Sequence, residues 1–147
     1  ARHAGPASLR ELATAVQRLA QAHGARVLIN GEPGLAIELG LDGVHLPASA
    51  LTPVRPVPPG MLCGASCHDA RQLAAALVAG VDYVVLGPVA ETASHPGAAP
   101  LGWQAAAALI EDYPLPVYLI GGLGPNDLAA ARAAGAYGVA AIRAYVA

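Results

Sequence analysis

One junction occurs three times in the sequence, as Gly40-Leu41-Asp42-Gly43-Val44, Gly80-Val81-Asp82-Tyr83-Val84 and Gly135-Ala136-Tyr137-Gly138-Val139. Each copy follows a stretch rich in Ala and Leu and opens a short aliphatic run. A glycine just past a helix adopts the left-handed conformation that closes the last turn, and a short apolar run after it is typical of a buried strand. The three junctions therefore predict a series of βαβ units and an α/β fold.

Outward from these junctions, helical and strand-like segments alternate along the chain. We expect helices at 9–23, 35–39, 70–79, 103–112 and 126–134, and strands at 26–29, 43–46, 61–64, 83–86, 117–120 and 138–142. This order fits a doubly wound open sheet or part of an eight-stranded barrel, and periodicity does not choose between them. Because the chain opens without Met and runs at once into a helix, we expect a single domain, 1–147, taken from a longer chain.

The composition argues against several classes of protein. The chain is 55% hydrophobic and 12% charged, with a net charge of −2 and no Lys/Arg-rich stretch, so it is not expected to bind nucleic acid. No window approaches ~18 consecutive apolar residues, the length that predicts a membrane span. Two cysteines do not make a disulfide framework, so a reduced, cytoplasmic protein is expected.

Polar residues and glycines gather where the predicted strands end. This position matters because the chemistry of parallel α/β folds lies at the carboxyl ends of the strands. The residues there are Asn30, His45, Ser66, Cys67, His68, Thr92, Ser94, His95, Gly121, Gly122 and Arg143. His45 fits either a ligand contact or a hydrogen-bonded core imidazole.

The strongest physical signal is the pair Gly121-Gly122 together with Arg143. Two glycines after a late strand let backbone N–H groups approach an anion without a Cβ in the way, and the N-terminus of a following helix adds partial positive charge. In barrels, the loops after the seventh and eighth strands commonly form such a phosphate site. Arg143 adds a fixed fork of donors. The alternative is a tight turn with Arg143 pointing to solvent.

Two further features are weaker signals. The loop 87–97 is long and rich in small polar residues, which is typical of lids and binding loops, and its Glu91 is either an acid/base or a solvated carboxylate. Cys63, Cys67 and His68 suggest a metal site. Zinc takes three or four ligands and no second cluster completes this one, so no metal site is expected.

A set of short motifs runs in a fixed order from about Leu28 to Arg143. They are Leu28-Ile29-Asn30, Asp42-Gly43-Val44-His45-Leu46, Gly64-Ala65-Ser66-Cys67-His68, Ala79-Gly80-Val81-Asp82-Tyr83, Gly87-Pro88-Val89, Glu91-Thr92, Pro100-Leu101-Gly102, Ile120-Gly121-Gly122-Leu123 and Gly135-Ala136-Tyr137-Gly138-Val139-Ala140. In this order and spacing, the motifs resemble the thiamine-phosphate synthase family, including its thiazole tautomerase (TenI) branch.

The resemblance implies a (β/α)8 TIM barrel, of which this chain lacks the first strand, the first helix and most of the second strand. It also implies a role in thiamine biosynthesis, in which a thiazole phosphate is joined to a hydroxymethylpyrimidine pyrophosphate and Mg²⁺-bound pyrophosphate leaves. Together with the positions at the strand ends, it gives substrate-binding candidates Asn30, His45, Ser66 and Thr92, phosphate-binding candidates Gly121, Gly122 and Arg143, and catalytic candidates Ser66, Thr92 and His95.

The sequence departs from the family at its metal-binding acids. Gly31 stands where the family has an aspartate after Asn, and 47–50 contains no acid where the family has Gly-Gln-x-Asp. The family's loop lysine is His95 here, its late serine is Arg143, and the tautomerase histidine is Pro88. Mg²⁺ needs hard oxygen ligands, usually carboxylates. The family's Mg²⁺ is therefore not expected here, and whether the chain is catalytic stays open.

Three functions remain open. The stretches 94–103 and 45–47 look most like synthase-like domains fused behind a Nudix hydrolase. The first function is a synthase-like barrel that binds a small phosphorylated molecule. The second, which follows from the Nudix resemblance, is a non-catalytic ligand-binding or regulatory domain attached to an N-terminal Nudix hydrolase of the 8-oxo-dGTP diphosphatase type. The third is an unrelated barrel enzyme acting on sugar phosphates, for which Glu32 and Glu91 are the carboxylates at strand ends.

Overall fold

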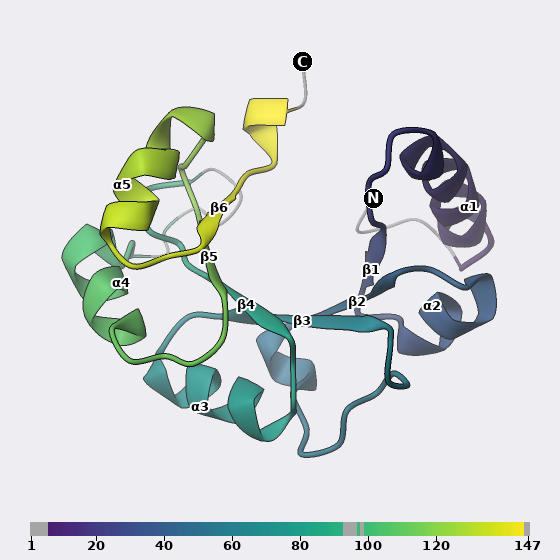
Figure 1. Cartoon of the computed structure of the whole chain (residues 1–147), viewed down its shortest axis with the longest axis horizontal. Coiled ribbons are helices and arrows are strands. Elements are labelled where there is room, and N and C mark those ends of the chain that lie inside the picture. Colours follow the sequence, from purple (N-terminus) through teal and green to yellow (C-terminus); the bar gives the residue numbers. More distant parts are fainter. Residues whose placement is uncertain (1–5, 93–96, 98, 146–147) are drawn as a thin grey trace.

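A computed structural model of the chain describes residues 6–92, 97 and 99–145 (Figure 1). In chain order the helices and strands are α1 (Pro6–Ala22), β1 (Leu28–Asn30), α2 (Pro33–Leu39), β2 (Gly43–Leu46), β3 (Leu62–Cys67), α3 (Ala70–Val78), β4 (Tyr83–Leu86), α4 (Gly102–Ile110), β5 (Val117–Ile120), α5 (Leu128–Ala133) and β6 (Gly138–Ala140). The described residues also form three short 3-10 helices, η1 (Ala48–Ala50), η2 (Pro125–Asp127) and η3 (Arg143–Tyr145).

The strands form one parallel sheet in the order β1-β2-β3-β4-β5-β6. A doubly wound sheet reverses its strand order at a switch point, whereas this sheet follows the chain order throughout. The helices lie along the outer side of its arc (Figure 1). Sequential parallel strands with helices outside are the arrangement of a (β/α) barrel. The barrel alternative is therefore confirmed, and β1 and β6 are the two edges of the described sheet.

The two faces of the sheet carry different side chains. On the outer face, fully buried residues pack beneath the helices: Val44, Cys63, Ala65, Val84, Leu86 and Leu119. Because side chains alternate along a strand, the residues between them point to the inner face. They include His45 on β2, Ser66 on β3, Tyr83 on β4 and Tyr118 on β5, all of which are half-buried. The apolar core thus lies between the sheet and the helices, and these four polar side chains lie on the inner face of the sheet.

Some element boundaries differ from those expected. β3 extends to Cys67, because it pairs with β4 as far as Leu86, so Ser66 belongs to the strand itself and does not follow it. Asn30 is likewise the last residue of β1. β6 ends at Ala140, after pairing with Ile120. The helix expected at 126–134 is divided into η2 and α5.

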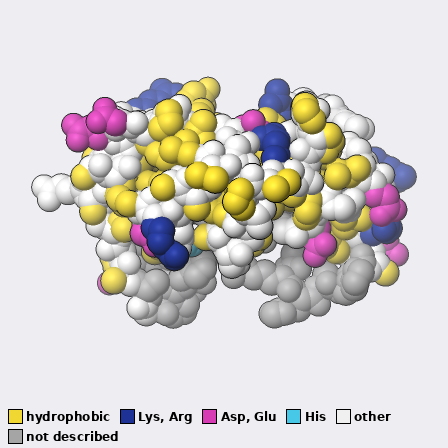
Figure 2. Space-filling model, turned by 90° about the horizontal axis from the view of Figure 1, so that it is seen from below, with side chains coloured by type: hydrophobic (Ala, Val, Ile, Leu, Met, Phe, Trp, Pro, Cys, Tyr) yellow, Lys and Arg dark blue, Asp and Glu magenta, His cyan; other side chains and the backbone are white. Residues whose placement is uncertain are grey.

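The surface of the described residues agrees with the composition. On the face shown in Figure 2, the described Lys and Arg side chains are scattered among apolar and acidic ones and form no basic patch. Among the described residues, no helix combines the length and the apolar character needed to cross a membrane.

Candidate functional site

A cavity of about 550 Å³ opens at the carboxyl ends of the strands. Its volume is in the range of small-molecule sites. Seven of the eight residues that the sequence singled out for binding or catalysis line it: Asn30, His45, Ser66, Thr92, Gly121, Gly122 and Arg143. The eighth, His95, lies outside the described residues. The structure thus brings together residues that lie up to 113 positions apart in the sequence, from Asn30 to Arg143.

His45 is the centre of a hydrogen-bonded group on the inner face of the sheet. Its Nε2 lies 2.9 Å from Ser66 Oγ, and its Nδ1 lies 3.3 Å from the Tyr83 hydroxyl. Burial lowers the pKa of His45 from its ordinary value, so the ring is neutral at pH 7. Burial also raises the pKa of Tyr83 to about 12, which keeps its hydroxyl protonated. His45 is therefore a neutral imidazole that joins a buried phenol to a serine at the cavity wall.

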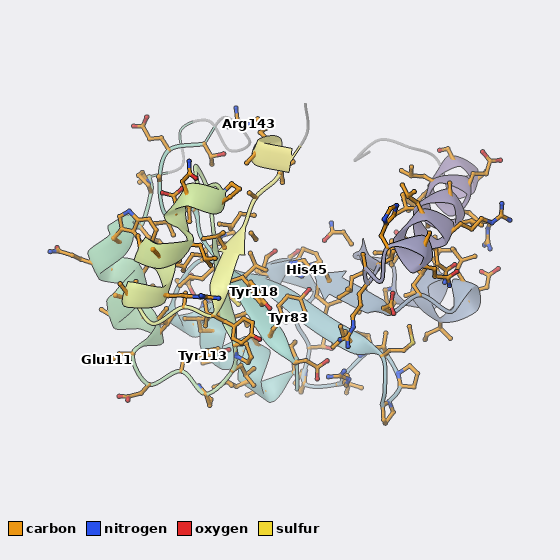
Figure 3. All side chains as sticks on the ribbon, turned by 45° about the horizontal axis from the view of Figure 1, so that its top comes forward. His45, Tyr83, Glu111, Tyr113, Tyr118 and Arg143 are labelled. Atoms are coloured by element: carbon orange, nitrogen blue, oxygen red, sulfur yellow. The ribbon has the colours of Figure 1, made fainter. Side chains whose placement is uncertain are left out.

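The Tyr83 ring reaches His45 across a glycine. His45, Gly64 and Tyr83 are register partners on three adjacent strands. A Cβ on Gly64 would lie 2.2 Å from Tyr83 Cζ, so only glycine leaves room for the ring. Tyr118 packs edge-on against Tyr83 with ring centroids 5.7 Å apart, and Figure 3 shows His45, Tyr83 and Tyr118 in a row on the inner face. This row fixes the orientation of the imidazole.

Replacing Tyr83 by phenylalanine tests this support. Because Tyr83→Phe removes only the hydroxyl, we expect the free energy of unfolding to fall by about 1 kcal/mol, the typical net contribution of one hydrogen bond. The ¹⁵N resonance of His45 Nδ1 should shift at the same time. Tyr118→Phe is the matched control, since its ring packs against Tyr83 in the same row but its hydroxyl is not one of the two hydrogen-bond partners of His45. Equal shifts of the His45 resonance in both variants would contradict the assignment.

Gly121 and Gly122 form a turn directly after β5. Their φ angles are 100° and 68°, in the left-handed region that favours glycine. A Cβ on Gly121 would lie 2.6 Å from Pro88 Cα, and one on Gly122 would lie 2.6 Å from Glu91 O, because the loop after β4 passes against the turn. Among the described residues, the N–H groups of both glycines have no backbone acceptor. The turn therefore has two N–H donors without a backbone acceptor, at residues that line the cavity.

Arg143 lies beyond the end of β6, at the far edge of the same cavity. Figure 3 shows it near the C-terminal end of the described chain, away from Tyr83 and Tyr118. Its Nη2 is 3.5 Å from Thr92 Oγ1, which is long for a hydrogen bond, and its side chain is exposed. The guanidinium and the diglycine turn thus line one cavity, as the sequence led us to expect.

The helical start after the diglycine turn, which we expected to add positive charge, carries a capping carboxylate. The chain continues as the 3-10 helix η2 before α5 begins at Leu128. The carboxylate of Asp127 accepts a hydrogen bond from the Gly124 N–H at 2.8 Å. This helical start is therefore already capped by an acid, whose negative charge lies beside its positive end.

The two cysteines and His68 lie in different surroundings. Cys63 and Cys67 are fully buried on the outer face, and burial raises the pKa of both thiols, that of Cys67 to about 11. His68 lines the cavity, and its Nδ1 contacts the carbonyl oxygen of Gly87. Within the described residues, no group of three or more His, Cys, Asp and Glu side chains gathers. Both thiols therefore pack as small hydrophobic side chains.

The sequence did not single out two residues for binding or catalysis. Tyr83 belongs to the second copy of the glycine junction and to one of the family motifs, but it was not proposed for the site. His68 was placed at a strand end and considered as a metal ligand, but not as a binding residue. The signal for Tyr83 is in the register, because Gly64 lies beside it on β3, and a glycine inside a strand often marks close approach by a neighbour.

The residues around the cavity do not fit the Mg²⁺ ion that the resemblance implies. Mg²⁺ in proteins is usually held by one or two carboxylates together with phosphate oxygens. No Asp or Glu is among the residues that line the cavity. Glu32 and Glu91 follow β1 and β4, but both are exposed and neither reaches the lining.

Comparisons with known proteins agree with the fold and the motifs. The chain is 42% identical over 144 residues to the thiamine biosynthesis bifunctional protein ThiM/ThiE of Symbiobacterium thermophilum, covering 95% of this chain and 30% of that one. It is 40% identical over 139 residues to the thiamine-phosphate synthase of Methanoculleus marisnigri, covering 91% of this chain and 65% of that one.

Among solved structures, thiamine phosphate pyrophosphorylase from Pyrococcus furiosus matches with a TM-score of 0.82 at 22% identity. The match covers 97% of this chain and 69% of that structure, and it shows the same fold. The chain thus spans from about a third to about two thirds of these relatives. The family model for thiamine monophosphate synthase matches residues 1–145. With its sequential parallel strands and its motifs in order, the chain belongs to the thiamine monophosphate synthase family.

Proposed function

We propose that the chain is the phosphate-binding part of a thiamine-biosynthesis enzyme that joins a thiazole phosphate to a hydroxymethylpyrimidine pyrophosphate. The observation that carries this proposal is the diglycine turn, whose two residues line the cavity and whose N–H groups have no backbone acceptor among the described residues. Phosphate oxygens bind well to such backbone donors. The names of the relatives supply the thiamine pathway, and the small phosphorylated substrate follows from the family.

In this proposal, each part of the cavity has one task. The amides of Gly121 and Gly122 bind the phosphate, and Arg143 adds charge-assisted hydrogen bonds to it. Ser66, held by the neutral His45, contacts the ring part of the substrate. Asn30 and Thr92 complete the polar wall on either side. Ser66 and Thr92 are the catalytic candidates among the described residues.

Replacing Arg143 by alanine is the direct test of the phosphate site. A hydrogen bond to a charged group contributes about 1.5–3 kcal/mol, so we expect Arg143→Ala to weaken binding of a thiazole phosphate roughly ten- to hundredfold. Calorimetric titration of the wild-type chain and the variant measures the loss. Arg132→Ala is the matched control, because Arg132 is an exposed arginine on α5 that does not line the cavity. Equal affinities of all three proteins would rule out this phosphate site.

The second candidate is a non-catalytic ligand-binding or regulatory domain. It is favoured by the lack of any carboxylate in the lining of the cavity. An assay of thiamine phosphate formation with the full-length protein separates the two: turnover at ordinary enzyme rates supports the synthase, and phosphate binding without turnover supports the second candidate. The relatives described above are named for thiamine biosynthesis, and none of them supports the Nudix fusion.

Three broader expectations belong to the same proposal. Residues 1–147 form one domain of the barrel. The cavity binds small molecules and no nucleic acid, which agrees with the scattered cations on the face in Figure 2. The protein is cytoplasmic, which agrees with two free, buried cysteines.

A further inference from the structure

The acidic residues of this chain all lie away from the cavity wall. The sequence has ten Asp and Glu residues, and all of them fall within the described residues. Asp42 and Asp82 precede β2 and β4, where they accept hydrogen bonds from the backbone N–H groups of Val27 and Cys63. The cavity is at the opposite ends of these strands. These two acids therefore stabilise the amino ends of the sheet.

The other acids also have tasks elsewhere or point to solvent. Asp69 caps α3 by accepting a hydrogen bond from the Gln72 N–H at 2.8 Å, and Glu38 pairs with Arg10 on the surface. Asp127 caps η2. The remaining acids are exposed and do not line the cavity: Glu11, Glu32, Glu91, Glu111 and Asp112. No carboxylate oxygen is thus placed in the wall to hold a cation between the protein and an anionic ligand.

The positive charge of the cavity comes from one side chain. All eight basic residues of the sequence are arginines, and Arg143 is the one that lines the cavity among those the structure describes. His45 adds no charge at pH 7, because burial lowers its pKa. At the diglycine turn, an anion therefore meets the amides of Gly121 and Gly122 and one arginine, Arg143, among the described residues.

This donor set matches a phosphomonoester better than a pyrophosphate ester. A phosphomonoester carries about −1.5 to −2 charges at pH 7, which one guanidinium and two amide donors largely compensate. A pyrophosphate ester carries more negative charge, and uncompensated charge in a cavity is costly. Enzymes that bind such groups usually place Mg²⁺ on one or two carboxylates beside the phosphates. That arrangement has no counterpart in this cavity.

We infer that the diglycine turn and Arg143 bind a phosphomonoester directly, without a divalent cation, and that this part of the cavity discriminates against pyrophosphate. The inference rests on the proposed phosphate site and specifies its ligand class and its metal independence. It sets this chain apart from the Mg²⁺ dependence that its family resemblance implies. The discrimination against pyrophosphate follows from two features of the cavity, the lack of a carboxylate in its wall and the single arginine that lines it. It should therefore be seen in binding measurements, without any reaction.

Calorimetric titrations with inorganic phosphate and with inorganic pyrophosphate, each in Mg²⁺ and in EDTA, test the inference on the full chain. We expect phosphate to bind with a Kd that changes by less than about twofold between the two conditions, since no carboxylate is there to recruit Mg²⁺. Pyrophosphate should bind more weakly than phosphate in both conditions. Tightening of either anion by about tenfold or more in Mg²⁺ would overturn the inference while leaving the phosphate site intact. Absence of any phosphate binding would overturn the proposed function, and the inference with it.

A gain-of-function variant separates the role of the missing carboxylate from other causes. Gly31 follows Asn30, which lines the cavity, and a Cβ there meets no atom closer than 3.9 Å. Its φ of 74° is left-handed, which Asp and Asn both tolerate better than other side chains. We expect Mg²⁺ to tighten pyrophosphate binding in Gly31→Asp and not in the neutral control Gly31→Asn. The same absence of a Mg²⁺ effect in both would contradict the assignment of metal independence to the missing acid.

Discussion

Replacing Gly121 by alanine is expected to lower the free energy of unfolding by about 2–5 kcal/mol and to abolish measurable phosphate binding. Two effects add at this position. The φ of 100° is unfavourable for any residue with a Cβ. The new Cβ would also lie 2.6 Å from Cα and Cβ of Pro88, so the turn and the loop after β4 must move apart. Because that movement displaces the free N–H groups, binding and stability should fall together.

Gly40→Ala is the matched control for Gly121→Ala. Gly40 closes α2 with a φ of 60°, and a Cβ there meets no atom within 4 Å. Its substitution should therefore show only the cost of a left-handed alanine, about 1 kcal/mol, with phosphate binding unchanged. Urea denaturation and calorimetry on both variants give the comparison. A Gly121→Ala protein no less stable than Gly40→Ala and still able to bind phosphate would show that the turn is not closely packed.

Replacing Gly64 by alanine is expected to have the second largest effect. Gly64 is buried between His45 and Tyr83 in the sheet, and a Cβ would lie between 2.2 and 2.5 Å from three atoms of the Tyr83 ring and hydroxyl. Overpacking of this kind costs about 1–3 kcal/mol. The ring must leave its place, so the 3.3 Å contact with His45 Nδ1 should be lost as well. NMR of the His45 ring and chemical denaturation measure the two consequences.

Gly34→Ala provides the opposite result as a control. Gly34 is exposed within α2, and a Cβ there meets no atom within 4 Å. Alanine in a helix is favoured over glycine by about 0.5–1 kcal/mol, so this variant should be slightly more stable than the wild type. Its His45 resonances should not change. If Gly64→Ala behaved like Gly34→Ala, the tyrosine row would not be the support that holds the imidazole.

The fold could be predicted from the sequence because its signals are local. Glycine after a helix and an aliphatic run after glycine each reflect the conformation of a few residues, and together they located β2, β4 and β6. What they could not give is the order of strands in the sheet. That order depends on which strand edges meet in space. The pairing of the strands in chain order, from β1 to β6, distinguishes a barrel from a doubly wound sheet. The ends of β3 and β6 were missed because pairing, not composition, sets where a strand stops.

The candidate site was predictable to the extent that strand ends meet at one edge of a parallel sheet. This rule alone placed Asn30, Ser66 and Arg143 in one cavity, although they are far apart in the chain. The direction in which a side chain points required the structure. Tyr83 reaches across Gly64 to His45, which no local pattern predicts. Asp127 caps η2, so a carboxylate already lies at the helical start beside the diglycine turn.

The central claim is that the amides of Gly121 and Gly122 bind an anion with the help of Arg143. The most direct measurement is a titration of the ¹⁵N-labelled chain with inorganic phosphate, following the amide resonances of the two glycines. We expect saturable downfield shifts of both amide protons, and a much higher phosphate concentration for half-saturation in Arg143→Ala. Amide resonances of Gly121 and Gly122 that stay in place while phosphate binds elsewhere, or does not bind, would contradict it.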